Sequence, residues 1–153
     1  MPRRKDPLSR AQHRKIGADL FNYTWTLLDR KSRSSDQDNE MLNAAHASRY
    51  HWSHAGKALQ ESIGEWQLSR VYSVLGRAEP ALYHGRRCLE VSREACLASF
   101  YRAYAYEAMA RASGVAGKRA DRNRYLREAR KVGEGVRERH ARRMLFEDLE
   151  TIP

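Results

Sequence analysis

The stretch spanning residues 62–92 constrains the fold most, because it encodes two helices and the tight turn between them. Ser62 followed three residues later by Glu65 has the spacing of a capping box and predicts that a helix begins directly after the serine. Gly76 can adopt a positive φ and is expected to end this helix, and Pro80 suits the first turn of the next one. These signals together predict a helical hairpin in which the second helix can pack close to the first. The first helix has a face of large apolar residues and the second a face of mostly small ones: Leu68, Val71, Tyr72 and Leu75, then Ala81, Leu82, Gly85, Cys88 and Leu89.

Length and composition favour one compact helical domain. A chain of 153 residues with 41% hydrophobic residues, four prolines and nine glycines is neither disordered nor typical of a β-sandwich. Cys88 and Cys96 would lie about 12 Å apart along a continuous helix, too far for a disulfide. We therefore expect free thiols in a reducing compartment. Because no apolar run is long enough to span a membrane, we predict a cytoplasmic protein that has no membrane among its partners.

The net charge of +10 is concentrated near the two ends of the chain. Residues 1–15 carry six Lys/Arg against one acid and are predicted to form a basic, flexible arm that precedes a single domain over 16–153. Residues 117–143 carry eleven Lys/Arg against four acids. Such segments can attract nucleic acid through counterion release, although arginine-rich helix faces are also ordinary protein surface.

The rest of the chain also has helical periodicity, and about seven helices are expected in an all-α fold. Ser35 with Asp38 repeats the capping spacing at the start of the second helix. The last helix, over 136–149, is expected to cover the exposed end of the stack. Outside the hairpin, the predicted helices span residues 16–30, 36–55, 97–115, 118–133 and 136–149.

Gly76 and Gly117 are 41 residues apart, and the spacing of large and small residues around them is similar. A weaker echo of the same spacing ends at Gly56. The matching positions are Leu68, Ser69, Tyr72, Ala81 and Cys88 around Gly76, and Met109, Ala110, Ser113, Arg122 and Ala129 around Gly117.

This pattern resembles that of the tetratricopeptide repeat (TPR) over residues 39–133, as in short, functionally uncharacterised bacterial TPR-like proteins. The resemblance implies antiparallel helix pairs in a short right-handed superhelix. It also implies a concave groove that binds a peptide or protein and carries no catalytic residues. The period of 41 residues exceeds the usual 34, so an irregular superhelix is expected.

Carrying the groove positions of the family onto this sequence gives nine candidate partner-binding residues. Aromatic residues and arginines on a face not needed for the core often anchor partners, and an arginine can bind a carboxylate through two parallel bonds. An acidic peptide is therefore a natural ligand. The alternative is that these side chains only pack neighbouring helices together. The candidates are His46, Tyr50 and His54 on the second predicted helix, Trp66, Arg70 and Ser73 on the third, and Tyr104, Glu107 and Arg111 on the fifth.

Metal binding and catalysis are less favoured. His51 and His54 could chelate an ion, but a zinc site needs a third or fourth ligand, and Glu61 or Glu65 is a candidate for the third. The segment around Gly117 lacks the strand and the Ser/Thr of a phosphate loop, and no serine or cysteine has the context of a nucleophile. We therefore predict no catalytic residues, no cofactor and no metal site.

The sequence is compatible with three functional hypotheses. The first is a non-catalytic, TPR-like adaptor for a protein or peptide. The second is a nucleic-acid-binding protein that uses the basic arm and residues 118–143. The third is a metal protein built on the histidine-rich second helix. A homo-oligomer is compatible with each of them.

Overall fold

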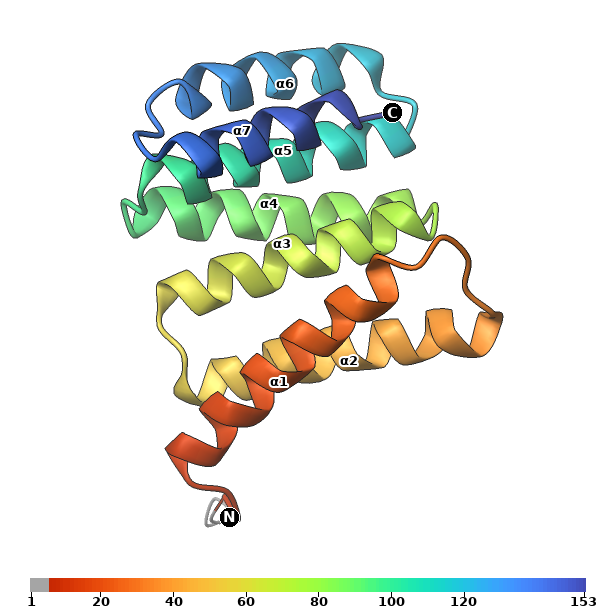
Figure 1. The fold of residues 1–153 in the computed structure, drawn as a ribbon, viewed down its shortest axis with the longest axis vertical. Coiled ribbons are helices and arrows are strands. Elements are labelled where there is room, and N and C mark those ends of the chain that lie inside the picture. Colours follow the sequence, from red (N-terminus) through yellow and green to blue (C-terminus); the bar gives the residue numbers. More distant parts are fainter. Residues whose placement is uncertain (1–5) are drawn as a thin grey trace.

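The computed structural model of the protein describes residues 6–153, and the first five residues of the predicted arm lie outside this part. Within it the chain forms seven α-helices and no strand, so the predicted all-α fold is confirmed (Figure 1). The helices are α1 (Arg10–Leu28), α2 (Ser35–Ala55), α3 (Ala58–Val74), α4 (Ala78–Glu94), α5 (Ser99–Val115), α6 (Arg119–Gly133) and α7 (Arg139–Glu150).

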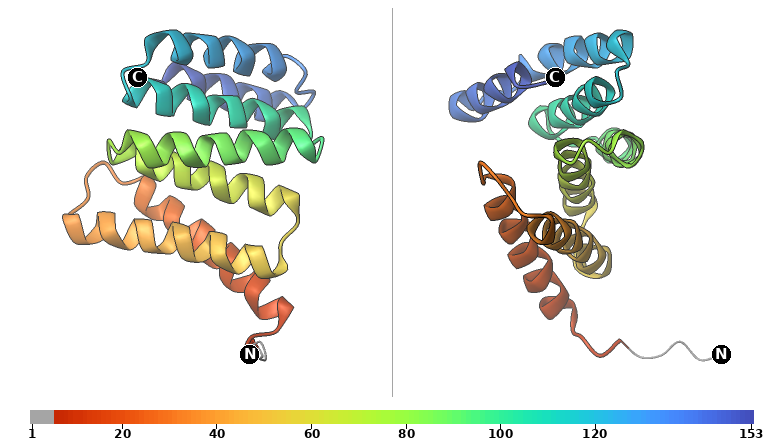
Figure 2. Two further views of the ribbon diagram at one scale, coloured as in Figure 1. Left: turned by 180° about the vertical axis from the view of Figure 1, so that it is seen from behind. Right: turned by 90° about the vertical axis from the view of Figure 1, so that its right-hand side faces the viewer.

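The helices pack as consecutive pairs, α1 with α2, α3 with α4 and α5 with α6, in the manner of a helical repeat. In the side view of Figure 2, α1 and α7 lie on the same side of the stack at its two ends, and α3 and α5 lie between them. No helix of the described part has both the length and the apolar character that a bilayer crossing requires.

Two glycine turns join the helices within the second and third pairs, as the sequence predicted. Gly76 has φ +69° and Gly117 has φ +70°. After α3 the amide of Arg77 donates to Tyr72 O at 2.9 Å, and the amide of Gly76 donates to Ser73 O at 3.0 Å. The same two bonds recur around Gly117, so both turns are Schellman motifs, in which a left-handed residue satisfies the last helical carbonyls.

A third Schellman motif ends α4, but its left-handed residue is Cys96, with φ +50°. The amide of Leu97 donates to Ser92 O, and the amide of Cys96 donates to Arg93 O. A side chain at a positive φ brings Cβ close to the following carbonyl oxygen, which destabilises the conformation. This turn links the second helix pair to the third.

Several helix starts differ from the prediction. Ser62 does not cap α3, because this helix begins at Ala58 and takes in both members of the predicted capping box. At the start of α2 the capping box consists of Ser34 and Gln37, one residue earlier than expected. Adjacent serines each followed by a suitable side chain three residues later make both assignments possible from sequence.

The predicted arm is also partly helical, since α1 begins at Arg10 rather than at residue 16. Ser9 and Gln12 form its capping box, and His13 in its first turn is buried. At the other end, α7 begins at Arg139, after the capping side chain of Glu138.

The third helix pair and α7 share one apolar cluster. Leu145 and Leu149 of α7 are 0% and 2% exposed, and they pack with Ala103 of α5 and Ala129 of α6. The last helix thus packs its apolar face against the third helix pair.

Candidate functional site: an aromatic pocket between α1, α3, α5 and α7

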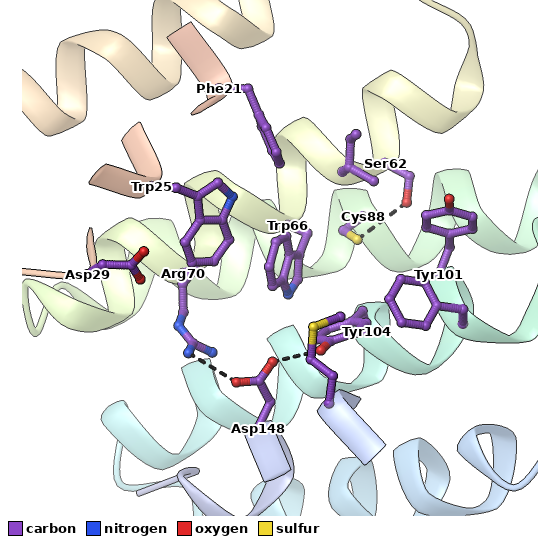
Figure 3. A pocket seen from close by; sticks show the side chains of 13 residues that line it. Phe21, Trp25, Asp29, Ser62, Trp66, Arg70, Cys88, Tyr101, Tyr104 and Asp148 are labelled. Carbon is purple, nitrogen blue, oxygen red and sulfur yellow. Dashed lines mark hydrogen bonds and ion pairs between the residues drawn. The ribbon is translucent and has the colours of Figure 1, made fainter. Parts of the chain in front are cut away.

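A pocket of about 540 Å³ opens between the first helices of the three pairs and α7 (Figure 3). Its walls are mainly aromatic, with a few polar groups at one end, which is the usual composition of a binding site. The lining residues are Phe21, Trp25 and Asp29 of α1, Ser62, Ile63, Trp66 and Arg70 of α3, Cys88 of α4, Phe100, Tyr101 and Tyr104 of α5, and Met144 and Asp148 of α7.

The aromatic side chains contact one another from helix to helix. The ring centroids of Trp25 and Trp66 are 5.3 Å apart, those of Trp66 and Tyr104 are 5.2 Å apart, and those of Tyr104 and Phe100 are 5.0 Å apart. The last two pairs are edge-to-face, an arrangement that aromatic quadrupoles favour. The pocket wall is therefore one continuous aromatic surface contributed by α1, α3 and α5.

A buried carboxylate, that of Glu107, lies behind this wall. It is 0% exposed and accepts hydrogen bonds from Trp66 Nε1 at 3.0 Å, Arg70 Nη1 at 3.0 Å and Arg111 Nε at 2.6 Å. A buried charge has to be paired and hydrogen-bonded, and Glu107 is both. The network fixes the orientation of the indole and of the guanidinium that face the pocket.

Asp148 of α7 completes the polar end of the pocket. It accepts a hydrogen bond of 2.7 Å from the Tyr104 hydroxyl and lies 3.7 Å from Arg70 Nη2. Burial and the adjacent Asp148 carboxylate raise the pKa of Tyr104 well above its usual value, so its hydroxyl remains a donor. The charges of Arg70 and Arg111 balance those of Glu107 and Asp148, and Asp29 adds one exposed acid at the rim.

Five of the nine predicted partner-binding residues come together here. Trp66, Arg70 and Tyr104 line the pocket, whereas Glu107 and Arg111 lie beneath its wall. Ser73, on the same helix as Trp66, is buried outside the pocket, and its hydroxyl has no hydrogen-bond partner among the described residues.

The three candidates on α2 lie elsewhere, which corrects the predicted groove. His46 bonds to the Tyr72 hydroxyl at 2.8 Å, Tyr50 is 58% exposed, and His54 stacks on His13. The pocket is lined by the first helix of each pair. In the first pair this helix is α1, so α1 and not α2 borders the pocket. The weak echo at Gly56 suggested the opposite, but Gly56 has φ −84° and links two pairs.

Several pocket residues were missed by the sequence reasoning. Phe21 and Trp25 are four residues apart on α1, so they lie on one helix face. Treating α1 as the first helix of a pair would have identified them. Asp148 and Met144 carry no such signal, because their position depends on how α7 folds back on α5.

Cys88 borders the pocket but has the character of a core residue. The residue is 1% exposed, and its Sγ lies 3.6 Å from the Ser62 hydroxyl. Burial raises the pKa of Cys88 to about 12, so the thiol is protonated at neutral pH and a poor nucleophile.

A comparison of the chain with protein-family models, curated proteins and solved structures found no match in any of the three. The resemblance to TPR proteins therefore rests on the spacing around Gly76 and Gly117, whereas the pairwise packing of the helices is observed directly.

Proposed function

We propose that this protein is a non-catalytic, TPR-like adaptor that binds a partner by taking one of its large apolar side chains into the aromatic pocket. The observation that carries the proposal is that Trp25, Trp66 and Tyr104 line one cavity between the helices. Aromatic residues in concave surfaces are the typical anchoring points of protein interfaces.

The repeat-like organisation supports the TPR-like part of the proposal. The second and third helix pairs turn through the same glycine Schellman motif, 41 residues apart. The first helix of every pair contributes to the pocket, and α7 packs over the last pair.

The chemistry of the walls favours an aromatic or long aliphatic anchor over the acidic one expected from sequence. Arg70 is paired with Glu107 and Asp148, so its charge is already neutralised. Its side chain is 17% exposed, which leaves it able to donate a hydrogen bond to a carbonyl of a bound peptide. An apolar side chain would release water from the aromatic surface, and this gain scales with the area buried.

Selection from a random peptide library tests the proposal. Peptides selected by the wild type should share an aromatic or large aliphatic residue. Substitution of that residue by alanine should weaken binding about tenfold or more, as expected for an interface anchor.

Tyr101→Ala and Met144→Asp in the pocket should have similar effects. Tyr50→Ala is the matched control, because Tyr50 is an exposed aromatic residue on α2 outside the pocket. Selected peptides without a common apolar residue, or equal binding by all three variants, would refute the proposal.

A basic surface favours a second candidate function, nucleic-acid binding. Nine of the eleven Lys/Arg residues in 117–143 are exposed, from the N-cap of α6 to α7. Phosphate contacts of this kind would give an affinity that falls steeply with salt. An electrophoretic shift of DNA or RNA at low salt should then disappear near physiological salt. Unshifted probes at low salt would remove this candidate. The basic residues that are exposed are Lys118, Arg119, Arg124, Arg127, Lys131, Arg137, Arg139, Arg142 and Arg143.

A further inference from the structure

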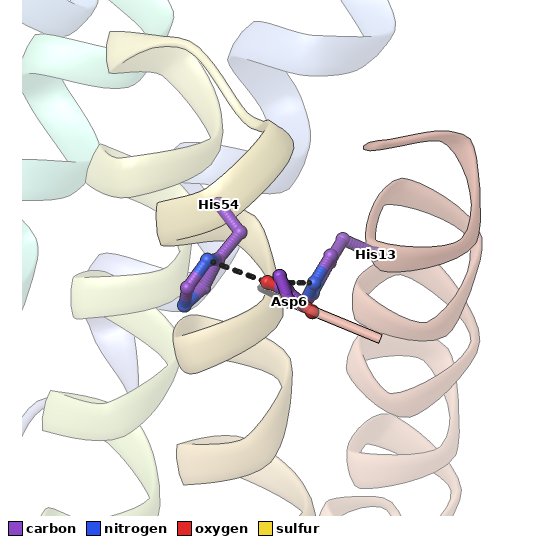
Figure 4. Close-up of side chains that lie close together, drawn as sticks. All are labelled: Asp6, His13 and His54. Atoms are coloured by element: carbon purple, nitrogen blue, oxygen red, sulfur yellow. Dashed lines mark hydrogen bonds and ion pairs between the residues drawn. The ribbon is translucent and has the colours of Figure 1, made fainter. Parts of the chain in front are cut away.

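Outside the aromatic pocket, three potential metal ligands converge where the segment before α1 meets the end of α2 (Figure 4). Asp6 Oδ2 lies 2.9 Å from His13 Nε2 and 3.4 Å from His54 Nδ1. The candidate ligand atoms of the three residues all lie within 4.8 Å of one another. We propose that Asp6, His13 and His54 form a binding site for a divalent transition metal ion of the zinc type.

The spacing of these atoms is close to that of a coordination shell. Bonds of about 2.0–2.1 Å in a tetrahedral site place neighbouring ligand atoms roughly 3.3–3.4 Å apart. The two distances to Asp6 match this value within about 0.5 Å. The rings of His13 and His54 are stacked, with centroids 4.6 Å apart. His54 therefore has to turn toward the ion, and its side chain is 37% exposed.

The ligand types suit a borderline metal. Two imidazoles and one carboxylate bind zinc, cobalt and nickel in proteins, whereas calcium and magnesium prefer oxygen ligands. Asp6 is 40% exposed and His54 37%, so the site is open to solvent on one side. Water can complete the coordination there.

His51 is positioned to form a hydrogen bond with the ring nitrogen of His13 that would not bind the ion. Its Nδ1 lies 2.8 Å from Nδ1 of His13, which is 3% exposed. With the ion on Nε2, His13 would donate its Nδ1 hydrogen to His51. A bond of this kind fixes the tautomer and the ring orientation of a ligand.

The sequence alone could not identify this site, because the two ligands besides His54 come from α1 and the segment before it. Glu61 and Glu65, the acids considered as ligands from sequence, are instead bound to Arg49 at 2.9 Å each. A metal ion at the observed site would tie residue 6 to the end of α2 and so hold the chain before α1 in place.

Metal titration of protein that carries no polyhistidine tag tests the inference. Chelator-treated protein is titrated with ZnCl₂ by calorimetry, and with CoCl₂ to follow the visible bands of tetrahedral cobalt. We expect one equivalent to bind. Asp6→Asn and His54→Ala should each weaken binding at least tenfold, and the same concentration of zinc should raise the melting temperature of the wild type more than that of either variant.

Two further variants sharpen the result. His51→Ala should weaken binding 10–100-fold through the outer-shell bond. His140→Ala removes an exposed histidine of α7 and should bind as the wild type does. Helicity measured by circular dichroism identifies any variant that fails to fold. If either Asp6→Asn or His54→Ala is unfolded, the metal affinity of the other one tests the inference. A wild type that binds no metal at millimolar zinc, or that binds no more tightly than both ligand variants, would overturn the inference.

Discussion

Arg70 of α3 donates a hydrogen bond of 3.0 Å to the fully buried carboxylate of Glu107 on α5. The pair joins two neighbouring helix pairs directly behind the aromatic pocket. Arg111 bonds to the same carboxylate and also to Asp148 O and the Thr151 hydroxyl, at 3.1 and 2.7 Å. One acid therefore couples the packing of α3, α5 and α7.

Glu107→Gln is expected to destabilise the fold by about 3 kcal/mol or more. The change leaves Arg70 and the buried Arg111 without their shared counter-charge, and breaking a buried ion pair on one side costs roughly 3–5 kcal/mol. Urea unfolding followed by circular dichroism measures the free energy. Glu147→Gln, at a side chain 72% exposed, is the control and should change stability by less than about 0.5 kcal/mol. A loss below about 1 kcal/mol for Glu107→Gln would contradict this role.

The three Schellman motifs predict opposite effects for opposite substitutions. Gly76→Ala puts a Cβ on a left-handed residue and should cost about 1 kcal/mol, although no atom within 4 Å would clash with it. Cys96→Gly removes such strain. Allowing for the greater freedom of glycine in the unfolded chain, it should leave stability unchanged or raise it by up to about 1 kcal/mol. Thermal unfolding measures both. Destabilisation by Cys96→Gly as large as that by Gly76→Ala would show that the Cys96 turn is unstrained.

Features of the fold that depend on local backbone chemistry were predictable from the sequence. Gly76 and Gly117 mark their turns because few residues other than glycine adopt a positive φ easily. The helices themselves follow from apolar periodicity. The turn at Cys96 was not predictable in this way. Cys96 occupies the left-handed position of a Schellman motif, as the two glycines do, but a cysteine does not indicate a positive φ.

Features that depend on which helices pair were harder to predict. Whether α1 or α2 faces the pocket is a question of tertiary packing, and the repeat spacing was too weak at Gly56 to decide it. Glu107 was selected as a groove residue, but its contacts with Arg70 and Trp66 bury it beneath the pocket wall. The site of Asp6, His13 and His54 joins residues more than 40 positions apart. Spacing along one helix cannot reveal such a site.

The two cysteines should differ sharply in reactivity. Cys96 is exposed, whereas Cys88 is buried and burial raises its pKa to about 12. In the native protein at pH 8, an aromatic disulfide reagent should therefore titrate one thiol rapidly, and the second only after denaturation. Cys96→Ser should abolish the rapid phase and Cys88→Ser should preserve it. Two rapid thiols in the folded wild type would contradict the packing of α4.

The contacts of Glu65 predict that the folded protein loses stability in acid. Glu65 accepts hydrogen bonds from Arg49 Nε at 2.9 Å and His84 Nδ1 at 2.6 Å, and so links α2, α3 and α4. Burial alone would raise its pKa, but the bonds and charges of His84 and Arg49 outweigh burial and lower the pKa below the usual 4.5. The folded state then binds fewer protons than the unfolded state, so the contribution of Glu65 is present above about pH 4.5 and is lost as the pH falls through the lower, folded pKa. Glu65→Gln should therefore reduce the free energy of unfolding at pH 7 and by progressively less toward pH 3. Glu90→Gln, at an acid 54% exposed, controls for the removal of a carboxylate. A stability difference between wild type and Glu65→Gln that stays constant from pH 7 to pH 3 would show that the ionised carboxylate is not what stabilises this junction of three helices.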